Sequence, residues 1–222
     1  MKKKVIVLLV ALALLLSAVP FALAAGNGDD YDKNYKVTTV KDVKSGDAVI
    51  GAVLQILDSN KKVVEEWTTT KEDHELTSVL IAGATYTLHE KSAPDGYIVA
   101  DDVTFTVSKD GSIDFVEMKD DWTKVTVLKY SMATKKLLAG STLQVIDPDT
   151  KEVVYEWTTD GTATRFEGFL KAGKTYILKE TKAPTGYTAA AEVTFTVSDD
   201  GKEDTVTMYD NYTRVSIKKI AK

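Results

Sequence analysis

The chain has 222 residues, 44% hydrophobic and 27% charged, a composition typical of globular domains rather than of disordered or collagen-like chains. It has no cysteine and two histidines, which excludes disulfides, a cysteine nucleophile, and metal sites built from thiolates or several imidazoles. The formal net charge is −5, with no basic run beyond the first four residues, so nucleic-acid binding is not expected.

The N-terminal residues 1–24 have the pattern of a secretory signal peptide. Three lysines at 2–4 precede an apolar run over 5–16, and Ala-Leu-Ala at 22–24 offers the small residues that a signal peptidase accepts. A membrane anchor is the alternative, but the apolar stretch is barely long enough, and the polar linker at 25–34 favours cleavage. We therefore expect an exported protein that has no membrane segment after cleavage.

The rest of the chain is an internal repeat, with an offset of 89 or 90 positions between matching segments. Residues 51–58 match 140–147, residues 66–69 match 156–159, and residues 103–108 match 193–198. One unit is about 90 residues, the size of a small domain, so we expect two tandem domains over 35–121 and 122–211.

Residues 212–222 resemble the start of a third unit, because 213–219 parallels 123–129. One strand cannot form a domain, so this is expected to be the orphan first strand of a truncated third domain. The alternative is that it adds to the sandwich of a neighbouring molecule.

Within each unit the hydrophobic period is two, as in Val193-Thr-Phe-Thr-Val197. Short runs rich in Thr, Val, Tyr and Phe are separated by Asp-Gly, Asp-Pro and Ala-Gly turns, and no stretch of the mature chain has helical periodicity. The pattern predicts an all-β fold of two immunoglobulin-like antiparallel β-sandwiches. Trp67 and Trp157 follow Val-Val runs at equivalent positions and are expected to pack rather than bind a ligand.

Three charged positions in each unit break the alternation that would point them outward, since each shares a strand face with apolar neighbours. They fall at the ends of the first strand, a middle strand and the last strand. The six residues are Lys41, Glu90 and Asp120 in the first unit, and Lys129, Glu180 and Asp210 in the second. An isolated buried charge is costly, so we expect the three residues of each unit to meet.

Two twelve-residue segments then point to a family. Residues 86–97 (YTLHEKSAPDGY) and 176–187 (YILKETKAPTGY) resemble the Y-x-L-x-E-T-x-A-P-x-G-Y box of Cna B-type domains, the prealbumin-like, SpaA-type modules of Gram-positive surface proteins and pilins. The Leu-Ala-Gly before Ser141 and the Met-x-Asp endings at 118–120 and 208–210 are similar to the same family. The resemblance covers essentially all of 35–211.

The resemblance implies a role for each of the six charged residues. In that family a first-strand Lys and a last-strand Asn or Asp join spontaneously as an isopeptide bond, assisted by the Glu. The implied bonds are Lys41–Asp120 with Glu90, and Lys129–Asp210 with Glu180. The first unit departs from the box, because Lys-Ser follows Glu90 where the family usually has Thr.

The expected chemistry is consistent with burial. An apolar environment lowers the pKa of a lysine and raises the pKa of a carboxyl, so a neutral amine can attack a neutral acid. The Glu would polarise the carbonyl and carry the proton. A buried but unlinked cluster remains the alternative. Asp121 and Asn211 rank second as acceptors, because strand alternation points them outward. Lys219 matches the position of the reactive lysine in a third unit, but it has no Glu or Asp partner in this chain.

The expected function is that of a secreted cell-surface structural or stalk protein, adhesin or pilin-like, of a Gram-positive bacterium. It is not an enzyme beyond one self-modification per domain, and no cofactor or metal is expected. Its partners would be the cell wall, other surface or pilus subunits, or host matrix. The alternative is an adhesin module that binds host matrix or glycan through loops such as 70–79 and 160–168.

Overall fold

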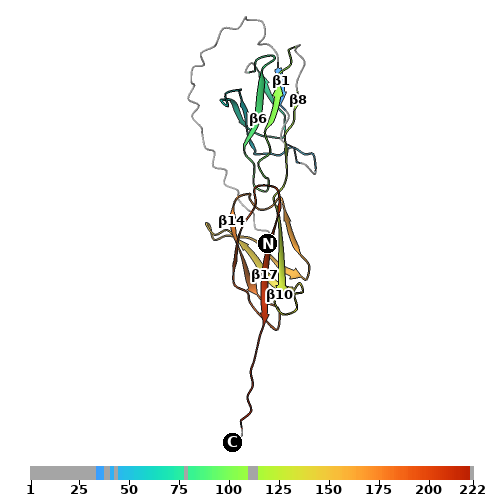
Figure 1. Ribbon diagram of the computed structural model, residues 1–222, viewed down its shortest axis with the longest axis vertical. Helices are drawn as coiled ribbons and strands as arrows, with labels where there is room; N and C mark the ends of the chain where they lie inside the picture. Colours follow the sequence, from blue (N-terminus) through green and yellow to red (C-terminus); the bar gives the residue numbers. More distant parts are fainter. Residues whose placement is uncertain (1–33, 38–40, 43–44, 78–79, 110–114, 221–222) are drawn as a thin grey trace, which may run out of the picture.

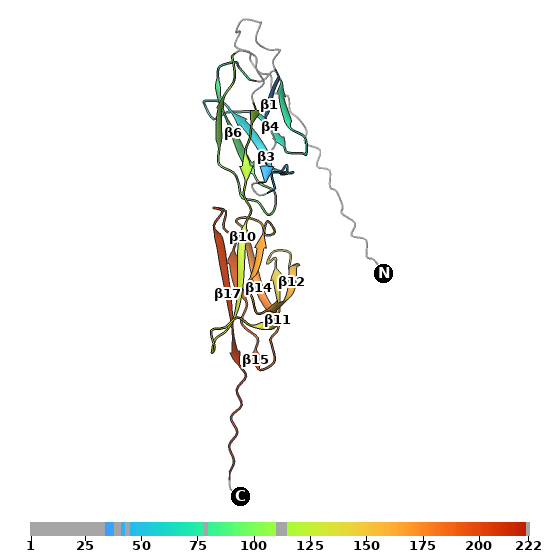
Figure 2. The same ribbon diagram turned by 90° about the vertical axis from the view of Figure 1, so that its right-hand side faces the viewer.

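The computed structural model describes residues 34–37, 41–42, 45–77, 80–109 and 115–220 (Figures 1 and 2). Within these ranges all regular secondary structure is β-strand, as predicted. No membrane-spanning helix occurs in this part of the chain. The predicted signal peptide lies outside the described residues, and so does the predicted linker except for its last residue, Asn34, where the first strand begins.

The first domain contains one four-stranded antiparallel sheet in the order β4-β3-β6-β7 and two smaller sheets, β5-β1-β8 and β2-β9. The strands of the larger sheet are β3 (Val53–Leu57), β4 (Val63–Thr68), β6 (Thr85–Ser92) and β7 (Val103–Thr106). The strands of the smaller sheets are β1 (Asn34–Val37), β2 (Lys41–Asp42), β5 (His74–Thr77), β8 (Phe115–Val116) and β9 (Lys119–Asp120).

The second domain repeats this plan with two four-stranded sheets, β13-β10-β17-β15 and β12-β11-β14-β16. The first sheet contains β10 (Lys124–Ser131), β13 (Thr164–Glu167), β15 (Tyr187–Thr188) and β17 (Glu203–Tyr212). The second contains β11 (Ala139–Ile146), β12 (Val153–Asp160), β14 (Thr175–Lys182) and β16 (Val193–Thr196). Each domain has its own buried apolar cluster, so the two cores are separate.

The first and last strands of the second domain, β10 and β17, lie side by side and run parallel. Their register continues over eight residue pairs, from Lys124 opposite Glu203 to Ser131 opposite Asp210. The strand by which the chain enters this domain is therefore the neighbour of the strand by which it leaves. Figure 2 shows the two strands running along the long axis of the molecule.

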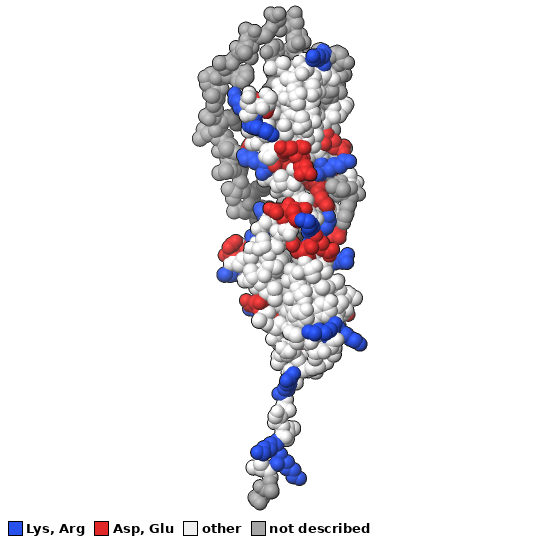
Figure 3. All heavy atoms as spheres, viewed as in Figure 1, with Lys and Arg blue, Asp and Glu red and all other residues white. Residues whose placement is uncertain are grey.

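The two domains meet end to end through a tight backbone junction (Figure 1). Thr123, which is 2% exposed, donates its N–H to the carbonyl of Gly96 at 2.9 Å and its hydroxyl to the carbonyl of Leu170 at 2.7 Å. Gly168 donates its N–H to the carbonyl of Thr123 at 3.0 Å. In Figure 3 acidic and basic side chains gather around this junction, where Lys171 pairs with Asp95 across it at 3.0 Å.

The glycine at 96 is required by this close approach. Its φ is +94°, and a Cβ there would lie 2.4 Å from the carbonyl oxygen of Gly168. We expect Gly96→Ala to separate the domains, so that nitrogen NMR relaxation shows each tumbling faster and independently. Gly186→Ala is the matched control, because Gly186 occupies the same place in the second domain at φ +88° with nothing within 4 Å of its Cβ. Equal tumbling of the two variants would contradict this account.

Two expectations about loops are wrong. Segment 70–79 contains β5, and segment 160–168 contains β13. Each short strand pairs with the first strand of its domain, β5 with β1 and β13 with β10, so tertiary pairing converts expected loops into sheet. The expected third-unit strand is not paired: residues 213–220 form no strand, and Val215 and Ile217 are 84% and 91% exposed.

Candidate functional site

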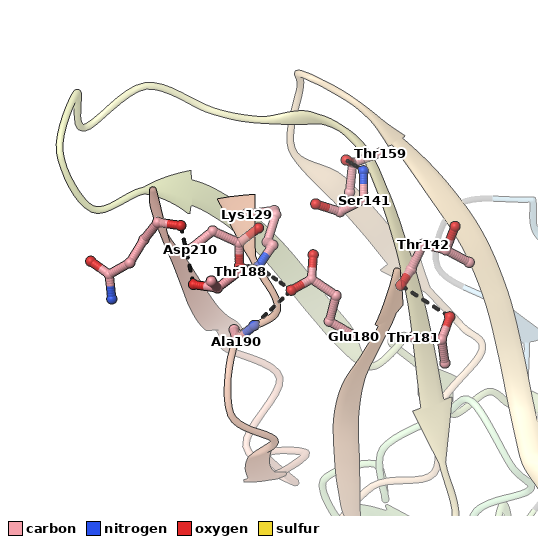
Figure 4. Close-up of polar contacts among 10 residues, drawn as sticks. Lys129, Ser141, Thr142, Thr159, Glu180, Thr181, Thr188, Ala190 and Asp210 are labelled. Carbon is pink, nitrogen blue, oxygen red and sulfur yellow. Dashed lines mark hydrogen bonds and ion pairs between the residues drawn. The ribbon is translucent and has the colours of Figure 1, made fainter. Parts of the chain in front are cut away.

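Lys129, Glu180 and Asp210 of the second domain meet inside its core. Lys129 is 1% exposed, Glu180 6% and Asp210 0%. The Lys129 Nζ lies 3.1 Å from Oε2 of Glu180 and also donates to Oδ1 of Asp210. Figure 4 shows the three side chains converging from three different strands. The prediction that these charged residues face inward and meet is confirmed in this domain.

Strand alternation accounts for this placement. On β10, Val125 and Val127 precede Lys129 on the buried face. Similarly, Tyr176 and Leu178 precede Glu180 on β14, and Val206 and Met208 precede Asp210 on β17. Because Lys129 lies opposite Met208 in the parallel register, Asp210 is two residues further along on the same face, within reach of a lysine side chain.

Burial changes the electrostatics of the cluster. Removal from water, with a smaller raising effect from Glu180, brings the pKa of Asp210 up to about 6 against the lowering effect of the Lys129 hydrogen bond. The backbone N–H of Ala190 donates to Oε2 of Glu180 at 2.8 Å, so this oxygen receives two hydrogen bonds. The aspartate is thus held where its neutral, protonated form is populated at mildly acidic pH.

Three buried polar atoms at this site have no hydrogen-bond partner among the described residues: Oε1 of Glu180, Oδ2 of Asp210 and Oγ of Ser141. Ser141 is 0% exposed, and in the view of Figure 4 its hydroxyl points toward the Glu180 carboxyl. Sequence reasoning did not single out this serine. The signal was present, since the repeat has Gly-Ser at 140–141 where the first unit has Gly-Ala at 51–52.

The first domain buries the corresponding acidic residues. Glu90 is 1% exposed and Asp120 0%. The N–H of Ala100 donates to Oε2 of Glu90 at 2.6 Å, equivalent to the Ala190 contact in the second domain. Desolvation raises the pKa of Glu90, against the lowering effects of the Ala100 hydrogen bond and of Asp120. Both domains therefore bury the two carboxyl side chains of the cluster.

The strand that carries Lys41 in the first domain pairs in a different register from the strand that carries Lys129 in the second. Lys41 lies opposite Lys119 on the neighbouring strand, and Asp42 lies opposite Asp120. In the second domain Lys129 lies opposite Met208, the residue equivalent to Met118. The pairing of Lys41 is therefore displaced by one residue relative to Lys129. Its side chain lies outside the described residues.

The remaining candidates lie at the surface. Asp121 pairs with Lys124 at 2.5 Å, whereas Asn211 and Lys219 are exposed. Trp67 packs against the first core and Trp157 against the second, as expected. Within the described residues no group of three His, Asp or Glu side chains is placed to hold a metal ion. The interior clusters remain the chemically distinctive sites of the described structure.

The geometry of the second cluster suits a condensation between two side chains. A lysine nitrogen lies against a carboxyl whose pKa is raised, and a second carboxyl contacts the same nitrogen. Proximity of this kind can lower a barrier by roughly 7–11 kcal/mol, because it replaces a bimolecular encounter.

Comparisons with known proteins give one family. The profile described as "SpaA: Prealbumin-like fold domain" matches residues 19–122 and again residues 123–212. A comparison with curated protein sequences finds no match.

Solved structures that resemble this chain include proteins of two bacteria. The Bacillus anthracis TIE protein is 21% identical over 81% of this chain, with a TM-score of 0.43, and this chain spans 34% of its length. The shaft pilin spaA from Lactobacillus rhamnosus GG is 18% identical, covering 83% of this chain and 99% of its own, with a TM-score of 0.36. The C-terminal fragment of the pilus adhesin SpaC from the same organism is 16% identical, covering 85% and 100%, with a TM-score of 0.44.

Proposed function

The chain belongs to the family of SpaA prealbumin-like fold domains, and from that membership we propose that it is a structural protein of a bacterial surface, of pilin or stalk type. Its domains close themselves with lysine–aspartate isopeptide bonds, Lys129–Asp210 in the second and Lys41–Asp120 in the first. Glu180 and Glu90 assist. The single observation that supports the proposal best is the buried contact of the Lys129 Nζ with both Glu180 and Asp210.

The proposed reaction is a condensation that releases water. The neutral Nζ of Lys129 attacks Cγ of protonated Asp210, so that a C–N bond forms and a C–O bond breaks. Glu180 takes a proton from the amine and delivers it to the departing hydroxyl, which leaves as water. The groups needed are all supplied by the chain. Each domain reacts once, so the protein modifies itself rather than turning over a substrate.

The stalk role follows from the path of the chain. A Lys129–Asp210 bond would join β10 to β17, the strands by which the chain enters and leaves the second domain. The two domains are joined through Thr123 without a flexible linker, which favours a semi-rigid rod. In this proposal the leader directs export, and other surface or pilus subunits, the cell wall or host matrix are the partners.

The proposal is tested by the intact mass of the purified protein under denaturing conditions. A deficit of two waters against the calculated mass means that both domains are linked, and peptide mapping then locates the bonds. A deficit of one water is expected to map to the second domain, because the register of Lys41 is displaced in the first. An undiminished mass would leave an unlinked buried cluster and remove the proposed function.

As long as burial keeps Nζ of Lys129 neutral, bond formation in the second domain is expected to slow as the pH rises above the pKa of Asp210, about 6. Above this value the acceptor is a carboxylate, which an amine does not attack; below it, the neutral acid predominates. The rate is measured by folding the unlinked chain at a series of pH values. The variant Asp210→Asn is the control, since its amide acceptor does not titrate and should lack this decline. A wild-type rate that increases through the same range would contradict the expectation.

A further inference from the structure

Two buried polar atoms beside the reacting groups lack hydrogen-bond partners among the described residues. They are Oγ of Ser141 and Oε1 of Glu180. Buried polar atoms are normally paired, so an unpaired set at a reactive cluster calls for a functional reason. In Figure 4 the Ser141 hydroxyl lies on the side of the Glu180 carboxyl that faces away from Ala190.

The strand pairing places the two residues together. Leu143 of β11 lies opposite Glu180 of β14, and Ser141 is two residues before Leu143. Residues two apart on a strand share a face, and both Ser141 and Leu143 are fully buried. The register has an irregularity between Thr142 and Leu143, but Ser141 stays on the buried face with Leu143 and is thus one diagonal step from Glu180 on the inner face of the sheet.

We propose that Ser141 is a positioning residue for the Lys129–Asp210 reaction. Its hydroxyl hydrogen-bonds Oε1 of Glu180, directly or through one water, and holds the carboxyl with Oε2 against the lysine. The inference rests on the proposed function. The terminal torsion of a glutamate is broad, so a carboxyl anchored through one oxygen alone is free to swing. Anchoring the second oxygen keeps the proton-carrying group aligned with Nζ of Lys129 and with Asp210.

The first domain provides a natural comparison. Ala52 occupies the position of Ser141, and its N–H donates to the hydroxyl of Thr69 at 2.9 Å. The N–H of Ser141 donates in the same way to Thr159 at 3.1 Å. The backbone is thus held alike in both domains, and the difference is the serine hydroxyl. Among the described residues Oε1 of Glu90 has no hydrogen-bond partner either, and Ala52 offers no hydroxyl to satisfy it.

The experiment follows the rate of each bond in the full chain. Chain recovered in denaturant, where the fold that brings the groups together is absent, is diluted to start folding. Samples are quenched, and peptide mapping measures the Lys129–Asp210 bond separately from the first-domain bond. We expect Ser141→Ala to slow the second-domain bond on the order of ten- to a hundredfold, because a misplacement of about 1 Å can cost a reacting group about a hundredfold in rate. Ser141→Cys keeps the volume but little of the hydrogen bond, so it should slow the bond similarly.

The pH dependence of the bond-formation rate distinguishes a positioning role of Ser141 from a packing role. The charged groups facing Glu180 are Lys129 from β10 and Asp210 from β17, and neither variant alters them. Glu180 helps to raise the pKa of Asp210, so a Glu180 carboxyl that is no longer held in place should lose part of this effect and move the rate profile to lower pH. A purely structural serine would leave the profile in place.

The outcomes distinguish this inference from the function on which it rests. If the wild-type chain forms no Lys129–Asp210 bond, the proposed function fails. If the wild type forms the bond and both variants form it at the same rate with the same pH profile, only the role of Ser141 is overturned. Slower bond formation with a shifted profile and unchanged first-domain chemistry supports it.

Discussion

Replacing Lys129 with methionine is expected to remove the second-domain bond and most of the stability margin of that domain. The variant should lack the deficit of one water assigned to this domain. Its second domain should unfold with a free energy lower by about 4–5 kcal/mol, by analogy with a disulfide that closes a loop of similar length. For a domain of this size, each kcal/mol corresponds to about 4–8 °C, so the melting temperature should fall by about 20 °C or more.

Two further variants make this result specific. Glu180→Gln keeps the shape of the side chain and a carbonyl to accept from Ala190, but cannot carry the proton, so it should also leave the chain unlinked. Lys179→Met is the matched control: Lys179 neighbours Glu180 on β14 but is 45% exposed and pairs with Glu192 at 2.9 Å. A surface ion pair of this kind contributes little to stability, so the mass deficit and the melting temperature of Lys179→Met should match those of the wild type. Equal destabilisation by Lys179→Met and Lys129→Met would contradict the account.

Mechanical pulling on the chain ends is expected to give the second large effect. In the linked domain, force that enters along β10 passes through the amide at Lys129 to Asp210 and leaves along β17. The intervening residues are then shielded and the domain gives no unfolding step. Lys129→Met should restore a step: the two positions are 81 residues apart, so the released chain can extend by up to about 270–290 Å.

Single-molecule force spectroscopy measures this difference directly. The wild type and Lys129→Met are pulled from identical terminal handles, and the traces are compared for one additional step of this length. The first domain is an internal reference, because the substitution leaves it unchanged and its behaviour under force should be the same in both proteins. A full-length step from the second domain of the wild type would show that force is not carried by a covalent link.

Much of the site could be predicted from residue patterns because the pleat of a strand has a strict period of two. Lys129, Glu180 and Asp210 each break the alternation of their strands, and all three are buried. The repeat offset predicted two domains, and the turn residues predicted sandwiches. Glu90 and Asp120 follow the same logic in the first domain and are buried as well.

Other features depend on pairing partners that are distant in sequence. Segments 70–79 and 160–168 have the composition of loops, but parts of each become strands because a first strand lies beside them. The register of Lys41 against Lys119 is also set by which residue of the last strand lies opposite, and equivalence within the repeat could not predict its displacement from Lys129.

The sequence by itself therefore determined the fold class, the tandem organisation and the identity of the reactive candidates, because local alternation and repetition carry that information. Only the tertiary structure decided which atoms meet: Nζ of Lys129 with two carboxyls, and Gly96 against Gly168. These contacts join positions far apart along the chain. They arise from strand register and close packing, which depend on all the partners at once rather than on any one segment.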